Sequence, residues 1–267
     1  MITNQQIEEL EKKYLIKYYH FLKFAEDEML LGFKTKEDIK ADWFGLYKSG
    51  ISDFSTGAER IVYALLNGKG IGQPNSCPVG ADLFFEVEDA YIHIDLKTTG
   101  ATLNEIKGNK KKGIKAWSNN IGDYTTSVPV GENQNSYKGE ICRADGKSFS
   151  PIRNYTPSLP YVYNSGKKNE KPCLSYFITI LFDKDTLDVL VITIMSMPNG
   201  KLENHYKSKV LCAGKNIGET RFNFCKTPDF EILKDNSKRI KVVYFDKKMD
   251  KKYLSKLNFI EDIYDKQ

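Results

Sequence analysis

The stretch from Ala81 to Gly100, ADLFFEVEDAYIHIDLKTTG, constrains the fold most, because it predicts two strands joined by a tight loop. Alternate side chains of a strand point to opposite faces, which separates apolar from polar residues in the second half of this stretch. The apolar face receives Ile92, Ile94 and Leu96, and the polar face receives His93, Asp95 and Lys97. We expect His93 to lie at a hydrated edge of this strand.

The register of the predicted hairpin places two acids opposite each other. A loop centred on Glu88 and Asp89 pairs residues whose numbers sum to 177, so that Asp82 faces Asp95. Opposed side chains on one face have Cβ atoms about 4.5 to 5.5 Å apart, and two carboxylates at that distance repel each other. A divalent cation held between the two acids removes that repulsion.

Asp82 together with Asp95-Leu96-Lys97 resembles the PD-(D/E)xK nuclease motif, in which two acids and a lysine on a hairpin hold Mg²⁺ and cut a phosphodiester bond. The proline of that motif, Pro78, stands four residues upstream of Asp82 instead of next to it. The resemblance implies that Asp82, Asp95 and the carbonyl of Leu96 bind Mg²⁺, or Mn²⁺ in its place. It implies that Lys97 stabilises charge at the scissile phosphate.

A third acid, Glu59, precedes the hairpin, and two interpretations of it remain open. Thr56 or Ser55 can cap a helix that runs to Leu66, with Glu59 completing a capping box three residues after Thr56. The nucleases that the motif resembles often carry an acid on the helix before the first catalytic strand. That resemblance would instead add Glu59 to the catalytic metal site.

Polar segments after the hairpin are candidates for DNA contact. The segment 107–115 is rich in lysine, and 128–137 carries amides and a hydroxyl in a row, in a pattern similar to segments of type II restriction endonucleases. Lysines neutralise phosphates and amides read adenine, although solvated loops have the same composition. The predicted DNA contacts are Lys110, Lys111, Lys112, Asn133, Gln134, Asn135, Ser136, Tyr137, Lys215, Asn216, Arg221 and Asn223.

The remaining pattern predicts an α/β fold with a mixed central β-sheet flanked by helices, similar to that of restriction endonucleases. The chain of 267 residues suits a single domain, 1–267, with an N-terminal helical region at 1–50 and the catalytic hairpin at 81–99. Apolar periodicity predicts helices at 4–31, 36–47 and 250–264. Apolar and β-branched runs predict strands at 174–183, 186–197, 220–224 and 239–245, with the first two buried on both faces.

Composition limits the class of protein and the cellular compartment in which it works. Hydrophobic residues make up 40% of the chain and its net charge is +5, which describes a folded protein that permits a polyanionic partner. The five cysteines lack CxxC spacing, which disfavours a disulfide framework or a zinc site. No secretory leader or apolar run of membrane-spanning length is present, so we expect a cytoplasmic protein with no membrane contact.

The resemblance therefore implies a Mg²⁺-dependent type II restriction endonuclease that cuts both strands of a specific site in double-stranded DNA. Such an enzyme is expected to act as a homodimer, with residues 1–50 as the candidate dimer element, alongside a DNA methyltransferase for the same site. Two alternatives remain: a repair or recombination nuclease of the same superfamily that recognises DNA structure, and a DNA-binding module without catalysis.

Overall fold

A computed structural model describes residues 2–46, 53–68, 82–102, 128–130, 162–199, 210–212, 220–222 and 237–267, with the backbone alone at 67–68, 128–130, 210–212 and 220–222. The helices are α1 (Asn4–Phe24), α2 (Glu26–Trp43), α3 (Phe54–Gly68) and α8 (Lys251–Lys266). The strands are β1 (Leu83–Glu86), β2 (Tyr91–Ala101), β3 (Val128–Val130), β4 (Val162–Tyr163), β5 (Lys171–Asp183), β6 (Val189–Met197), β7 (Val210–Cys212), β8 (Thr220–Phe222) and β9 (Ile240–Phe245).

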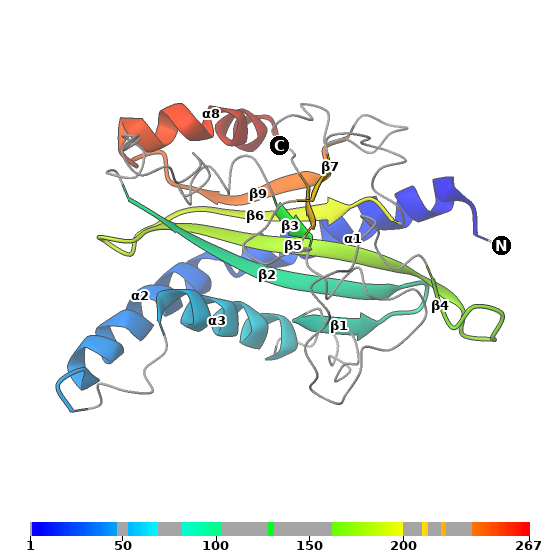
Figure 1. Cartoon of the computed structure of the whole chain (residues 1–267), viewed down its shortest axis with the longest axis horizontal. Helices are drawn as coiled ribbons and strands as arrows, with labels where there is room; N and C mark the ends of the chain where they lie inside the picture. The colour runs from blue at the N-terminus through cyan, green and yellow to red at the C-terminus, as the bar shows by residue number, and fades with distance from the viewer. Residues whose placement is uncertain are drawn as a thin grey trace.

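A mixed sheet of six strands forms the centre of the described structure and confirms the predicted fold class (Figure 1). Its strand order is β1-β2-β5-β6-β9, with β4 paired to the start of β5. Strands β2 and β5 run parallel, whereas the other neighbours run antiparallel. The hairpin register is the predicted one, because Leu83 lies opposite Ile94 and Glu86 lies opposite Tyr91. A separate three-stranded sheet has the order β3-β8-β7.

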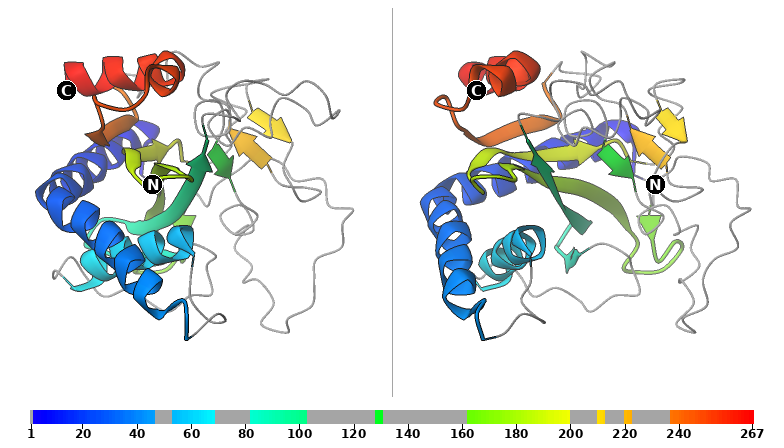
Figure 2. Two further views of the ribbon diagram at one scale, coloured as in Figure 1. Left: turned by 90° about the vertical axis from the view of Figure 1, so that its left-hand side faces the viewer. Right: turned by 60° about the vertical axis from the view of Figure 1, so that its left-hand side comes forward.

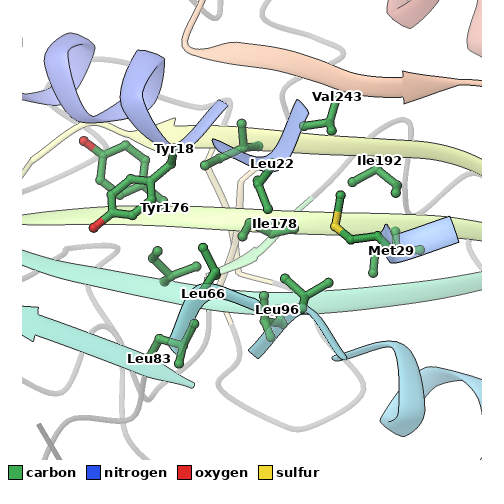
Figure 3. Close-up of a cluster of buried hydrophobic side chains, with 14 of the residues drawn as sticks. Tyr18, Leu22, Met29, Leu66, Leu83, Leu96, Tyr176, Ile178, Ile192 and Val243 are labelled. Carbon is green, nitrogen blue, oxygen red and sulfur yellow. The ribbon is translucent and has the colours of Figure 1, made fainter. Parts of the chain in front are cut away.

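Three helices cover one face of the central sheet, as the two views of Figure 2 show for α1, α2 and α3. The apolar stripe of β2 points into this layer, where Leu96 packs in one cluster with residues of all three helices. Figure 3 shows part of that cluster, with Leu22 from α1, Met29 from α2 and Leu66 from α3 facing the strands. The predicted alternation of the hairpin strand is therefore confirmed.

Helix α8 covers part of the opposite face, next to β9 (Figures 1 and 2). Its buried side chains Tyr253, Leu257 and Ile260 pack with residues of β5, β6 and β9. Because both faces are covered, every residue of β6 is buried and β5 is buried over nearly its whole length. The expectation of two strands buried on both sides is confirmed.

The N-terminal helical region is divided differently from the prediction. One helix was expected from residue 4 to 31, but α1 ends at Phe24 and α2 begins at Glu26. Ala25 separates them with φ −93° and ψ 12°, outside the helical range. Leu22, Ala25 and Met29 are all buried in spite of this break. The apolar spacing continues across the break because both helices pack on one core, so periodicity alone does not reveal it.

A buried ion pair joins the N-terminal helix to the residue that directly precedes β9. Arg239 Nη1 lies 2.7 Å from Glu11 Oε2, and both side chains are only 1% exposed. The backbone N–H of Asn199 donates to the other Glu11 oxygen at 2.7 Å. Burial raises the pKa of Glu11, although Arg239 opposes that shift. Separately, no helix among the described residues combines the length and apolarity needed to cross a bilayer.

Candidate active site

The turn of the hairpin between β1 and β2 is tied to two other elements. Val87 N–H donates to the carbonyl of Ala90 at 2.9 Å and closes the turn. From α1, the hydroxyl of Tyr14 donates to Asp89 Oδ1 at 2.5 Å, and from β5, Lys171 Nζ donates to the carbonyl of Val87 at 2.7 Å. Contacts from both sides of the turn therefore fix the position of the hairpin relative to the sheet.

Two acids meet at the open end of this hairpin. Asp82 directly precedes β1, and its Oδ2 accepts a hydrogen bond of 2.6 Å from the backbone N–H of Leu96. Asp95 lies beside it on β2 and is only 5% exposed. Burial raises the pKa of Asp95 to about 8, and the carboxylate of Asp82 adds to that rise. The environment of Asp95 therefore opposes its negative charge.

Lys97 is the positive group of the site. Its Nζ lies 2.8 Å from Asp95 Oδ1 and 2.7 Å from Asp95 Oδ2. Burial alone would lower the pKa of Lys97, but the carboxylates of Asp95, Asp82 and Glu59 outweigh burial and raise it. The ammonium group therefore keeps its proton at neutral pH.

Glu59 reaches the site from α3. Its Oε1 accepts a hydrogen bond of 3.0 Å from the hydroxyl of Thr98, the residue after Lys97. Burial raises the pKa of Glu59, the hydrogen bond from Thr98 lowers it, and the charge of Asp82 raises it further. The predicted capping box is wrong: Asp53 Oδ1 accepts from Thr56 N–H at 2.8 Å and caps a helix that begins at Phe54.

These groups meet where β2 extends past the described end of β1. Strand β1 has 4 residues and β2 has 11, and among the described residues the second half of β2 has no strand on the hairpin side. The N–H of Leu96 points to this side, towards Asp82. Because the N–H and C=O of a strand residue point to the same neighbour, the Leu96 carbonyl also faces this edge.

The donor atoms at this edge suit a hard divalent cation. Two carboxylates and one carbonyl are oxygen ligands, and Mg²⁺ takes few protein oxygens because it retains several waters. A cation here would supply positive charge that favours ionisation of buried Asp95. Within the described part of the chain, no group of three or more histidine, cysteine or acidic residues could hold a metal ion. The candidate ligands for a divalent cation are therefore Asp82, Asp95 and the Leu96 carbonyl.

His93 lies in the interior, so the expected hydrated edge is wrong. The residue is fully buried, and burial lowers its pKa to about 3. Its Nε2 lies 3.2 Å from the Tyr163 hydroxyl and 3.4 Å from Cys173 Sγ. Strand β5 and the short strand β4 cover this position, and both lie far from the hairpin in sequence.

The predicted DNA contacts fall almost entirely outside the described residues. This holds for Lys110, Lys111, Lys112, Asn133, Gln134, Asn135, Ser136, Tyr137, Lys215, Asn216 and Asn223. Arg221 lies in β8, where the backbone pairs with Pro129 of β3 and Leu211 of β7. Sequence reasoning also missed Thr98, whose only signal was its place directly after the lysine of the DLK motif.

A mixed sheet between helices, with two acids and a lysine gathered at an edge hairpin, defines the class of PD-(D/E)xK restriction endonucleases. Residues 3–186 match the family model described as the N-terminal domain of the type II restriction enzyme MwoI, and residues 189–245 match the model of its central domain. The chain therefore belongs to the MwoI family of type II restriction enzymes and is a site-specific type II deoxyribonuclease.

The fold comparison agrees with this family. The chain is similar to the crystal structure of the restriction endonuclease BglI bound to its DNA recognition sequence, with a TM-score of 0.55 and 13% sequence identity. The similarity covers 91% of this chain and 95% of the BglI chain. No curated protein sequence is significantly similar to the chain.

Proposed function

We propose that this restriction endonuclease depends on Mg²⁺, for which Mn²⁺ substitutes, held by Asp82, Asp95 and the carbonyl of Leu96. The observation that carries the proposal is the burial of Asp95 beside a second acid, which raises its pKa to about 8. When bound, the metal ion supplies Lewis-acid stabilisation of the charge that develops on the phosphate.

The other side chains act on the phosphate and on the attacking water. The carboxylates around Lys97 favour its charged form, so we assign it electrostatic stabilisation of the transition state. Glu59 stands beside Asp82 and Lys97 with one oxygen bound to Thr98. Its carboxylate orients the attacking water or a second metal ion.

The substrate is double-stranded DNA cut in both strands. Membership of a type II restriction family favours this substrate, and BglI was crystallised with its DNA recognition sequence. The net charge of +5 favours a phosphate backbone. The lysine-rich and amide-rich segments that follow the hairpin in sequence remain the candidate contacts.

The enzyme acts as a homodimer, and the outward side of α2 is a suitable surface. Of the large apolar side chains that are exposed in the described structure, most lie on or beside this helix: Phe24, Leu31, Ile39, Trp43, Phe44 and Leu46. An antiparallel twofold pairing of two copies of α2 centred at Thr35 sets Leu31 of one copy against Ile39 of the other, because the two numbers sum to 70.

Residues 1–267 form one domain, with the catalytic hairpin at 81–99. In support, the two matched family stretches meet at the turn between β5 and β6, and these strands pair in a single sheet. The protein works in the cytoplasm, where a DNA methyltransferase that modifies the same site protects the host DNA.

Digestion of sequenced plasmid DNA by purified protein tests this function. We expect discrete double-strand fragments in Mg²⁺ or Mn²⁺ and none in EDTA. Asp95→Ala and Lys97→Ala should each slow cleavage by about a thousandfold. Lys247→Ala, which removes a lysine from the exposed pair with Asp265, serves as the control and should cut normally. Metal-independent cutting, or normal cutting by both site variants, refutes the proposal.

A further inference from the structure

We propose that Thr98 is a positioning residue, whose hydroxyl holds Glu59 at the edge of β2 and so turns an acid of α3 towards the catalytic centre. This inference rests on the role proposed for Glu59. The hydrogen bond from Thr98 Oγ1 to Glu59 Oε1 measures 3.0 Å and joins residues 39 positions apart in the chain.

The need for an anchor follows from where the two residues originate. Helix α3 packs against the sheet face that receives Ile94 and Leu96, whereas Asp95 and Lys97 project from the other face. Glu59 therefore approaches the catalytic groups from the opposite layer. Thr98 alternates with Lys97 and projects towards α3, so its hydroxyl lies where it can hold the arriving carboxylate.

Repulsion between two carboxylates explains why Glu59 needs the hydrogen bond from Thr98. Burial is the main cause of the raised pKa of Glu59, and the charge of Asp82 raises it further, which means that the two carboxylates repel each other. A glutamate side chain has several rotatable bonds, so repulsion favours rotamers that point away from Asp82. The Thr98 hydroxyl opposes this rotation because it binds one of the two carboxylate oxygens.

Threonine suits this role better than serine. Its β-branch restricts χ1, so the strand backbone fixes the direction of the hydroxyl. Valine has nearly the same shape without the hydroxyl, which makes Thr98→Val the variant that removes only the hydrogen bond. Thr98→Ser keeps the donor but loosens it. Ser255, on the exposed side of α8, donates its hydroxyl to the carbonyl of Lys252 at 2.9 Å, so Ser255→Ala is a control that removes a hydroxyl hydrogen bond outside the site.

The experiment measures single-turnover cleavage and the Mg²⁺ midpoint for Thr98→Val, Thr98→Ser, Glu59→Gln and the double variant Thr98→Val/Glu59→Gln. We expect Thr98→Val to cut about tenfold more slowly with DNA affinity unchanged, which is the fold-change of one lost hydrogen bond. Thr98→Ser should recover to within about threefold of the native rate. Because Thr98 acts through Glu59, the double variant should be no slower than Glu59→Gln alone.

Three outcomes distinguish the role proposed for Thr98 from the role proposed for Glu59. If Glu59→Gln cuts at the native rate, the role proposed for Glu59 fails and the inference fails with it. If Glu59→Gln is slow and Thr98→Val is not, only the role of Thr98 is overturned. If Thr98→Val slows the Glu59→Gln enzyme as much as the native one, or Ser255→Ala has the same effect, the loss does not pass through Glu59 and the inference is also overturned. Thermal melts of every variant identify losses caused by unfolding.

Discussion

The surroundings of Asp95 disfavour the negative charge of its side chain. It is nearly fully buried and stands beside Asp82, and these two features raise its pKa to about 8. Lys97 partly compensates, with its Nζ within 2.8 Å of both carboxylate oxygens. At neutral pH without metal, the site is therefore close to the point at which Asp95 gains or loses a proton.

Metal affinity should rise with pH for this reason. Mg²⁺ binds the ionised carboxylate, so a protonated Asp95 must first release its proton. We expect the affinity for Mg²⁺, measured by isothermal titration calorimetry, to increase between pH 6 and 8 and to level off above the pKa of about 8. Asp95→Asn should lose binding at every pH, and Asp265→Asn on α8 should behave like the native protein. An affinity that does not change with pH contradicts the assignment of Asp95 as a ligand.

The stability of the metal-free protein should fall with rising pH. The pKa of Asp95 is raised from 3.8 to about 8 in the folded state, so its contribution to stability is full below pH 3.8 and is lost as the pH passes through 8. We expect the difference in free energy of unfolding between native protein and Asp95→Asn to change between pH 3.8 and about 8 in urea titrations and to level off above that pH. Excess Mg²⁺ should offset the loss in the native protein alone. Parallel pH profiles for the two proteins would exclude this linkage.

At the scale of elements, long-range polar contacts hold α1 against the sheet. Tyr14 of α1 binds the hairpin turn at Asp89, and Glu11 of the same helix binds Arg239 beside β9. The hairpin turn and the far edge of the sheet are thus tied to one helix. These contacts fix the helical layer from which α3 presents Glu59.

Breaking the buried pair on one side should destabilise the fold strongly. Arg239→Met leaves the Glu11 carboxylate buried without its partner, and we expect a loss of about 3 to 5 kcal/mol in the free energy of unfolding. The double variant Arg239→Met/Glu11→Leu should recover much of this loss, because it removes both buried charges. Lys247→Met breaks an exposed pair with Asp265 and should have little effect. Equal losses in the single and double variants would show that packing, and not charge, sets the cost.

At the scale of the whole molecule, the apolar surface of α2 determines how two copies can meet. Phe24 is 81% exposed and Leu46 is 82% exposed at opposite ends of this surface, and Leu31 lies between them. Cutting two strands at one site requires two catalytic centres. Because α2 also packs on α3, which carries Glu59, a dimer through α2 would relate the two centres by a fixed geometry.

Leu31→Asp should therefore weaken the dimer. We expect sedimentation at micromolar concentration to show a dimer for the native protein and a monomer for this variant, because a charge in the apolar surface must be desolvated on association. Plasmid cleavage should shift from double-strand breaks to nicks. Asn258→Asp, on the exposed side of α8, is the control. A dimer that persists in Leu31→Asp places the interface elsewhere.

The sequence by itself determined the local features: the mixed α/β pattern, the hairpin register and the face from which Asp95 and Lys97 project. These follow from strand alternation over a few residues, which the order of side chains fully encodes. Only the tertiary structure decided that His93 is buried, that Ala25 separates α1 from α2, and that Glu59 binds Thr98 and not a helix cap. The parallel pairing of β2 with β5 and the packing of α3 bring distant segments together, and no local pattern encodes contacts of such separation.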